Sequence, residues 1–355
     1  MSRLTIIALV FAAACGGKST PPPTTPLPED KPAEPVAKPE ETEKPAEPPK
    51  VEPIEIAINA PDVTVKLVKA GTGKKARLAY AAGKGGEKVP VEIAFDIGQK
   101  ATAAQGSEEM ITPTIVLLTD AETTAADEKT IGYTFSLKGI DARDVPNQNP
   151  KMTAQAIKDQ IGTLTGLTIS GKVGTNGVAS GATAIRIEKG DAAGKQVVDL
   201  VRQALPSWPT LPAEPVGVGA KWTATSKASL MGKLELTQET TYELVSRKGN
   251  VSTIKGTTKI SGTDADLDGS KISGIKGTGV TEATLTEGQF PSFKSNVETG
   301  FTVTDPAKNE SLTLGVKVGS AVTPKLVAAA EPPKPDAKTD AKPDAKTDAK
   351  TAPKK

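Results

Sequence analysis

The chain has 355 residues and a formal net charge of +2, so it offers neither a broad basic face for nucleic acid nor an acidic face for cationic partners. Aromatic residues make up only 3% of it, and there is no histidine, which removes the commonest general base and the commonest side-chain metal ligand. We therefore expect a non-enzymatic protein without a cofactor and without nucleic acid as a partner. Its core has to come from Val, Ile, Leu and Ala, as in a β-rich protein.

Residues 1–14 have the pattern of a signal peptide in front of a single cysteine. Arg3 supplies positive charge, Leu4 to Phe11 form a short apolar segment, and three alanines lead to Cys15. The apolar segment is shorter than the roughly 20 residues needed to cross a bilayer. The alternative is an ordinary secretory signal peptide followed by an incidental cysteine.

This N-terminus resembles a bacterial lipoprotein signal peptide, with alanine at Ala12 where leucine is more usual. In that family the cysteine receives a diacylglycerol and becomes the first residue of the mature chain. The resemblance implies that Cys15 attaches the protein to a membrane through lipid. Gly16 stands where Asp would signal inner-membrane retention, which implies the outer membrane if the cell is Gram-negative.

Two low-complexity segments flank the folded part. Residues 15–53 are rich in Pro, Glu and Lys and predict an extended tether. Residues 327–355 repeat Pro or Thr, Asp, Ala and Lys and predict a disordered tail of mixed charge. The sharper alternative for the tail is contact with anionic groups of the cell wall. With one cysteine in the chain, no intramolecular disulfide can form.

The segment 54–326 is predicted to fold as one β-rich domain with halves at about 54–205 and 206–326. Alternating or apolar runs predict strands in the first half at Ile54–Ile58, Val63–Val68, Ala76–Tyr80, Val91–Ile97, Ile111–Thr119 and Thr130–Leu137. In Val91–Ile97 the odd positions are apolar, which predicts that they share one buried face.

Two helices and a hairpin follow. Asn149 and Pro150 predict the start of a helix that carries Ile157 and Ile161 on its apolar side. A second helix is predicted after Asp191 and ends before Pro206. Between them, Leu167–Val173 and Gly177–Ile187 predict a hairpin that turns at Thr175-Asn176-Gly177.

Residues 205–222 hold both tryptophans and four prolines, which predicts an extended connector between the halves. Alternating residues that keep one phase across Gly232 then predict strands from Trp222 to Leu244. Further strands are predicted at Ser252–Ile260, Gly279–Leu285, Phe293–Val303 and Ser311–Val318. The expected fold class is α+β, mainly β, with a curved antiparallel sheet covered on one face by the two helices.

The run Pro215-Val216-x-Val218-Gly219-x-x-Trp222 resembles a family of bacterial envelope proteins of unknown function that are often lipid-anchored. The resemblance brings no catalytic residues. A curved sheet covered by helices is also similar to carriers of lipoproteins and lipids in the envelope, which is an analogy of fold alone.

Two further features have alternative interpretations. Asp264, Asp266 and Asp268 with Gly269 match the first half of a calcium loop, but the twelfth position is Ile275 in place of Glu, so a hairpin tip that caps its own backbone is favoured. Trp208 and Trp222 are candidate ligand-lining residues, and the competing interpretation is that both are core anchors.

We therefore expect a lipid-anchored envelope protein, a binding or carrier module for an apolar or peptide-like ligand. The alternative is a structural or surface-interaction lipoprotein whose partner is another envelope protein and which takes no small ligand. A hydrolase would need a pair of carboxylates in a cleft, and no spacing in the sequence marks such a pair.

Overall fold

The computed structural model describes residues 52–82, 87–125, 127–145, 152–205, 207–230, 234–267, 269–308 and 310–325. Cys15, the predicted tether up to residue 51, the predicted tail, and the predicted helix start at Asn149 and Pro150 lie outside these residues. Within the described ranges the fold is mainly β with two helices, as the sequence predicts.

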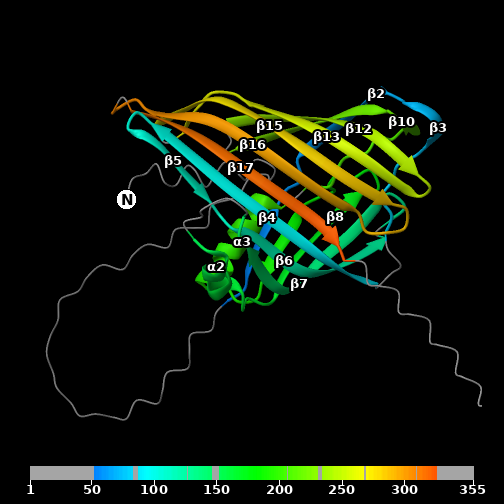
Figure 1. Cartoon of the computed structure of the whole chain (residues 1–355), viewed down its shortest axis with the longest axis horizontal. Helices are drawn as coiled ribbons and strands as arrows, with labels where there is room; N and C mark the ends of the chain where they lie inside the picture. The colour runs from blue at the N-terminus through cyan, green and yellow to red at the C-terminus, as the bar shows by residue number, and fades with distance from the viewer. Residues whose placement is uncertain are drawn as a thin grey trace, which may run out of the picture. The chain divides into compact units, whose positions relative to one another are not determined.

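Fifteen strands form one antiparallel sheet (Figure 1). They are β1 (Ile54–Ile58), β2 (Asp62–Lys69), β4 (Lys88–Ala103), β5 (Gly106–Ile111), β6 (Thr114–Ala125), β7 (Thr130–Arg143), β8 (Leu167–Gly174), β9 (Thr183–Ile187), β11 (Lys221–Leu230), β12 (Leu234–Lys248), β13 (Val251–Gly262), β14 (Ala265–Leu267), β15 (Ser270–Thr286), β16 (Ser292–Asp305) and β17 (Glu310–Pro324). A separate two-stranded sheet pairs β3 (Thr72–Ala76) with β10 (Val216–Val218).

The order of the main sheet is β1-β9-β8-β7-β6-β4-β17-β16-β15-β13-β12-β11-β2. Strands of the predicted first half therefore make one block and strands of the second half another, joined where β4 pairs with β17. Among the described strands of the main sheet, β2 alone lies in the block of the other half, since it pairs with β11. As a result β1 and β2, the two edges of this order, follow each other in the chain and are joined by residues 59–61 alone.

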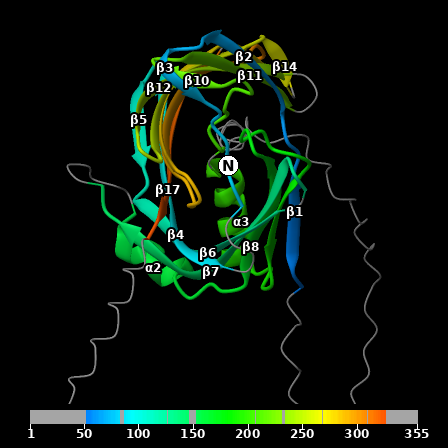
Figure 2. The same ribbon diagram turned by 90° about the vertical axis from the view of Figure 1, so that its right-hand side faces the viewer.

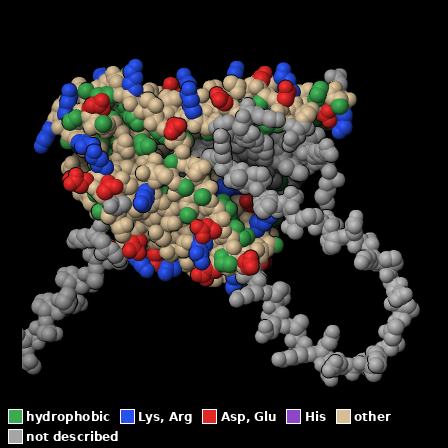
Figure 3. Space-filling view, turned by 180° about the vertical axis from the view of Figure 1, so that it is seen from behind, with side chains coloured by type: hydrophobic (Ala, Val, Ile, Leu, Met, Phe, Trp, Pro, Cys, Tyr) green, Lys and Arg blue, Asp and Glu red, His purple; other side chains and the backbone are tan. Residues whose placement is uncertain are grey.

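Alternation of apolar and polar residues places the core on the inner face of the sheet. Val91, Ile93, Phe95 and Ile97 of β4 are all buried, which confirms the predicted one-sided strand. The outer face carries Lys, Arg, Asp and Glu side chains of both signs, without a large field of either (Figure 3). One large hydrophobic cluster lies among the inner faces and the helices, and a smaller one joins the far ends of β12 and β15–β17.

Helix α3 (Ala192–Ala204) lies inside the curve of the sheet (Figure 2). The side chain of Asp191 accepts a hydrogen bond from the backbone N–H of Gly194 at 2.8 Å and so begins the helix, as the sequence predicts. Its apolar side buries Val197, Val201 and Ala204. Helix α3 therefore provides helical cover on the inner side of the sheet, as predicted.

Helix α2 (Ala154–Ile161) packs against β7 and α3. The predicted apolar residues Ile157 and Ile161 are buried. The described helix begins after Thr153, which is its N-cap and accepts from the backbone N–H of Ala156 at 3.1 Å, whereas the predicted start at Asn149 and Pro150 lies outside the described residues. No helix in the described part of the chain is long and apolar enough to cross a membrane.

Three strand predictions need correction. The predicted strand Ile111–Thr119 is interrupted, because β5 ends at Ile111 and β6 begins at Thr114. The segment Ala76–Tyr80 is not a strand, and β3 ends at Ala76. Its apolar alternation has another cause: Leu78 and Tyr80 turn into the core, and the backbone N–H of Tyr80 donates to the carbonyl of Thr175 at 2.8 Å.

The hairpin of β8 and β9 is confirmed, but its second strand begins at Thr183 and not at Gly177. Residues 175–182 instead form a loop, with one isolated bridge between Val173 and Ala179. This loop is longer than the tight turn predicted from Asn-Gly. The connector that follows α3 packs on it.

The run from Pro215 to Trp222 has a physical basis in the structure. Val216, Ala220 and Trp222 are fully buried, while Gly219 between them has φ of 77° and donates its N–H to the carbonyl of Leu244 at 2.8 Å. Glycine adopts a left-handed backbone conformation without strain. The run therefore has glycine at the turn, at Gly219, between the buried residues Val216 and Trp222.

Candidate ligand pocket

Among the described residues, three hydrogen bonds fix the connector between α3 and β10, two to residues of the first half of the chain and one to β11 of the second. The hydroxyl of Tyr80 donates to the carbonyl of Pro209 at 2.7 Å, and the backbone N–H of Leu211 donates to the carbonyl of Asn176 at 2.7 Å. The indole N–H of Trp222 donates to the carbonyl of Thr210, also at 2.7 Å. Since prolines hold this segment extended and cannot donate, two of these bonds use its carbonyls and one uses the N–H of Leu211.

Trp208, on this connector, is the centre of an aromatic cluster. Its ring lies 5.0 Å from that of Tyr80 and 5.8 Å from that of Tyr133, between ring centroids. Phe290 and Phe293 contact its ring at 5.6 and 6.1 Å. These rings come from both blocks of the sheet, so the connector draws a large share of the few aromatic residues into one place.

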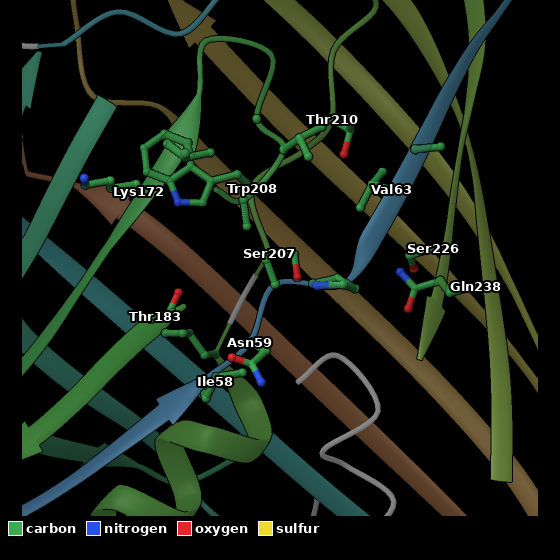
Figure 4. A pocket seen from close by; sticks show the side chains of 18 of the residues that line it. Ile58, Asn59, Val63, Lys172, Thr183, Ser207, Trp208, Thr210, Ser226 and Gln238 are labelled. Carbon is green, nitrogen blue, oxygen red and sulfur yellow. The ribbon is translucent and has the colours of Figure 1, made fainter. Parts of the chain in front are cut away.

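A pocket of about 140 Å³ lies beside this cluster, next to the passage from β1 to β2 (Figure 4). Its lining comes from residues 58–61 with Val63, the end of β8 and its loop, the end of α3 with the connector, and the inner faces of β11 and β12, together with Tyr133 of β7 and Thr183 of β9. Those segments are distant in sequence and meet because β1 and β2 stand at opposite edges of the sheet order.

The lining combines apolar surface with neutral polar groups. Trp208, Leu205 and Val63 supply apolar surface, and Ser207, Ser226, Gln238 and Thr240 supply hydroxyl and amide groups, several of which are seen in Figure 4. The hydroxyl of Thr240 is itself hydrogen-bonded to that of Thr258 at 2.9 Å within the sheet. A few polar groups set in apolar surroundings are typical of small-molecule sites.

Two charged residues belong to the described lining, and both are cationic: Lys172 and Arg202. In Figure 4 the side chain of Lys172 runs behind Trp208 and away from the middle of the pocket. The guanidinium of Arg202 lies 3.4 Å from the carboxylate of Asp199. No Asp or Glu is among the described residues that line the pocket.

Burial strongly raises the pKa of the Tyr80 hydroxyl above its ordinary value of 10.0, and the nearby Tyr242 raises it further. Burial also raises the pKa of Tyr133, although its hydrogen bond with the Thr183 hydroxyl at 3.0 Å acts in the opposite direction. Both phenols therefore remain protonated at neutral pH, and Tyr80 acts as a donor to the connector.

We expect Tyr80→Phe to lower the free energy of unfolding by about 1–2 kcal/mol at neutral pH, since the buried carbonyl of Pro209 loses its donor. The variant is also expected to be less sensitive to alkali. Because the folded pKa of Tyr80 is raised, its contribution is complete below pH 10 and is lost as the pH rises above that value, by about 1.4 kcal/mol per pH unit.

Denaturant unfolding between about pH 7 and 11 measures this difference, with Tyr133→Phe as the matched control for a phenol whose pKa is raised less. Parallel loss of stability in the wild type and Tyr80→Phe above pH 10 would contradict the role given to Tyr80.

The structure places the two tryptophans differently. Trp208 lines the pocket, whereas Trp222 is fully buried in the core behind it and stacks on Tyr242, with ring centroids 5.7 Å apart. Tyr242 in turn is part of the lining. Trp222 therefore supports the pocket wall from the core side.

The Asp264 loop is a hairpin tip beside β14. The carboxylate of Asp264 accepts the backbone N–H of Gly274 at 3.2 Å, Asp266 is exposed on β14, and Asp268 lies outside the described residues. Ile275, at the twelfth position, is buried in the smaller hydrophobic cluster. Among described residues no group of three or more His, Cys, Asp or Glu side chains could hold a metal ion.

A second hollow, of about 260 Å³, lies on the outer face where β4 leaves β6 and pairs with β5. Its lining carries Asp96, Glu298, Lys100 and Lys317, and aromatic residues are absent from its described lining. Although it is larger, its charges are mixed and open to solvent, so it gives an apolar ligand little to bind.

Sequence reasoning did not find Arg202, Gln238 or Thr240 as pocket residues. Each reads as an ordinary member of an amphipathic helix or strand, and no spacing links them. The one available signal was the concentration of tryptophan and proline in the connector, which pointed to Trp208.

Solved structures that resemble the chain include OccK2 (OpdF) of Pseudomonas aeruginosa, with 8% identity, a TM-score of 0.20, and coverage of 69% of this chain and 100% of that one. A loop-deletion mutant of OmpT, an outer membrane protein of Vibrio cholerae, matches at 5% identity and a TM-score of 0.16, with coverage of 66% and 99%. At these TM-scores the likenesses carry no argument about fold or function.

Among curated proteins, none matches the chain. Residues 207–301 match the model of DUF6263, a family of unknown function. The match begins in the connector and includes Trp208, the run from Pro215 to Trp222, and strands β11 to β15.

Proposed function

We propose that the protein is a lipid-anchored component of the bacterial cell envelope that binds a small, partly apolar ligand in the pocket beside Trp208, without catalysing a reaction on it. The observation that carries the proposal is the pocket itself, a cavity with one aromatic wall and several neutral polar groups at the junction of segments that are distant in sequence.

The size of the cavity restricts the ligand. An apolar cavity of about 150 Å³ is large enough to hold benzene. A cavity of about 140 Å³ therefore suits one ring or a branched chain of similar size, and a long acyl chain would have to extend beyond it. This favours a compact ligand, or the compact end of a larger one.

The envelope location rests on the N-terminal sequence. The apolar segment before Cys15 and the small residues next to it match the lipoprotein pattern, and the Pro-rich segment after it is typical of an extended spacer. Lipid on Cys15 would hold the ligand pocket near the membrane, with the outer membrane as the proposed site.

The test is a titration of the full chain with toluene, in which binding is monitored by the fluorescence emission of Trp208. We expect a saturable change in the wild type, because Trp208 lines the cavity while Trp222 is shielded in the core. Ser226→Phe places a ring in the cavity from β11 and is expected to weaken binding by about tenfold or more.

Lys227→Phe is the matched control, since the next residue of β11 carries the same ring to the exposed face. It is expected to bind toluene as the wild type does. If all three proteins respond equally, or none responds, the pocket is not a ligand site.

One observation favours the alternative, a surface-interaction protein without a small ligand. In the described part of the chain β2 is paired on one side only, with β11, and β1 only with β9. An open strand edge can pair with a strand of another protein. This alternative predicts that Ser226→Phe leaves partner binding intact, whereas a proline at Val65 in the middle of β2 abolishes it.

A further inference from the structure

The side chain of Arg202 points to the charge of the ligand. It stands in the last turn of α3 and belongs to the pocket lining. Its Nη2 contacts Asp199, but its Nε is buried and has no hydrogen-bond partner among the described residues. A buried N–H group without an acceptor costs free energy, and an acceptor on a ligand would remove that cost.

The remaining charges around the pocket favour a negative acceptor. Lys172 is the other charged lining residue, and no described lining residue carries a carboxylate. A guanidinium N–H binds a carboxylate more strongly than a neutral carbonyl, because the hydrogen bond is assisted by charge. An anion placed near Arg202 therefore meets attraction from the lining and no direct repulsion from it.

Two neighbours limit how much negative charge the site can hold. Asp199 already contacts the guanidinium at 3.4 Å, and the carboxyl end of α3 contributes a partial negative charge of its own. A single carboxylate fits this balance better than a doubly charged phosphate.

We infer that the pocket binds a compact apolar carboxylic acid, with the carboxylate at the Nε of Arg202 and the apolar group against Trp208. This inference rests on the proposed ligand-binding function and specifies its ligand class. The volume of about 140 Å³ sets the size of the apolar group at one ring or a short branched chain.

The experiment compares the affinities of phenylacetate and phenylacetamide for the full chain at neutral pH. Binding is monitored by the fluorescence emission of Trp208. The two probes share a ring and differ in charge. We expect the acid to bind the wild type about tenfold or more tightly than the amide. In Arg202→Met that preference is expected to vanish, while in Lys172→Met, which removes the other lining cation, it is expected to remain.

The outcomes separate this inference from the function on which it rests. Equal binding of the acid and the amide by the wild type, or an unchanged preference in Arg202→Met, overturns the carboxylate inference and leaves the pocket as a ligand site. Absence of a saturable response to both probes and to toluene overturns the two together. The side chain of Arg202 is 37% exposed, so its variant is expected to fold. The comparison of the two probes on the wild type does not depend on that variant.

Discussion

Replacing Trp222 with alanine is expected to lower the free energy of unfolding by about 3–5 kcal/mol, the loss usual for a large aromatic side chain removed from a core. Trp222 has no exposed surface, its indole N–H holds the carbonyl of Thr210, and its ring stacks on Tyr242. The substitution therefore removes core volume and one of the three bonds that fix the connector.

Thermal unfolding measures the effect, with an expected fall in Tm on the order of 10 °C. Trp222→Phe keeps most of the packing but leaves the carbonyl of Thr210 buried without its donor, so we expect an intermediate loss of about 1–3 kcal/mol. Trp208→Ala is the comparison variant. Because Trp208 is only partly buried, its replacement is expected to lower the free energy of unfolding by less. A Trp222→Ala variant as stable as the wild type would show that this residue does not anchor the connector.

The second large effect is expected at Gly177, where the β8–β9 loop meets the connector. Gly177 has φ of 81°, and an added Cβ would lie 2.4 Å from the carbonyl oxygen of Pro209 and 2.8 Å from the ring of Tyr80. Alanine there combines backbone strain of about 1–2 kcal/mol with a collision that only movement of the connector can relieve. We expect a total loss of roughly 2–4 kcal/mol and a shifted emission of Trp208.

Gly181 provides the matched control in the same loop. Its φ is 80°, and nothing lies within 4 Å of an added Cβ. Gly181→Ala should therefore show the backbone strain alone and leave Trp208 emission unchanged. Equal losses in the two variants, measured by denaturant unfolding, would mean that the loop does not support the connector.

Local pattern was enough to predict much of the fold. The alternation of Val91–Ile97 and the spacing of apolar residues after Asp191 correctly gave a one-sided strand and helix α3, since each depends on residues near in sequence. Strand β3 was missed because its sequence, Thr-Gly-Lys-Lys-Ala, is exposed throughout and carries no apolar pattern. Its pairing with β10 comes from a partner about 140 residues away.

The pocket could not be predicted either, because it also depends on pairing between strands that are distant in sequence. Periodicity says which face of β2 is apolar but not that β2 pairs with β11, at the opposite edge of the sheet order from β1. Without that pairing, Arg202, Gln238 and Trp208 are unrelated residues of a helix, a strand and a connector. The sequence did single out Trp208, because proline and tryptophan together mark an extended segment with a large side chain to place.

The central claim, that this is a lipid-anchored protein with a small ligand beside Trp208, is tested most directly by native mass spectrometry of the chain purified from the bacterial envelope. We predict a mature chain that begins at Cys15 and carries acyl groups, together with a small non-covalent adduct that is present in the wild type and absent in Ser226→Phe. A chain without lipid and without adduct in both proteins would contradict the account.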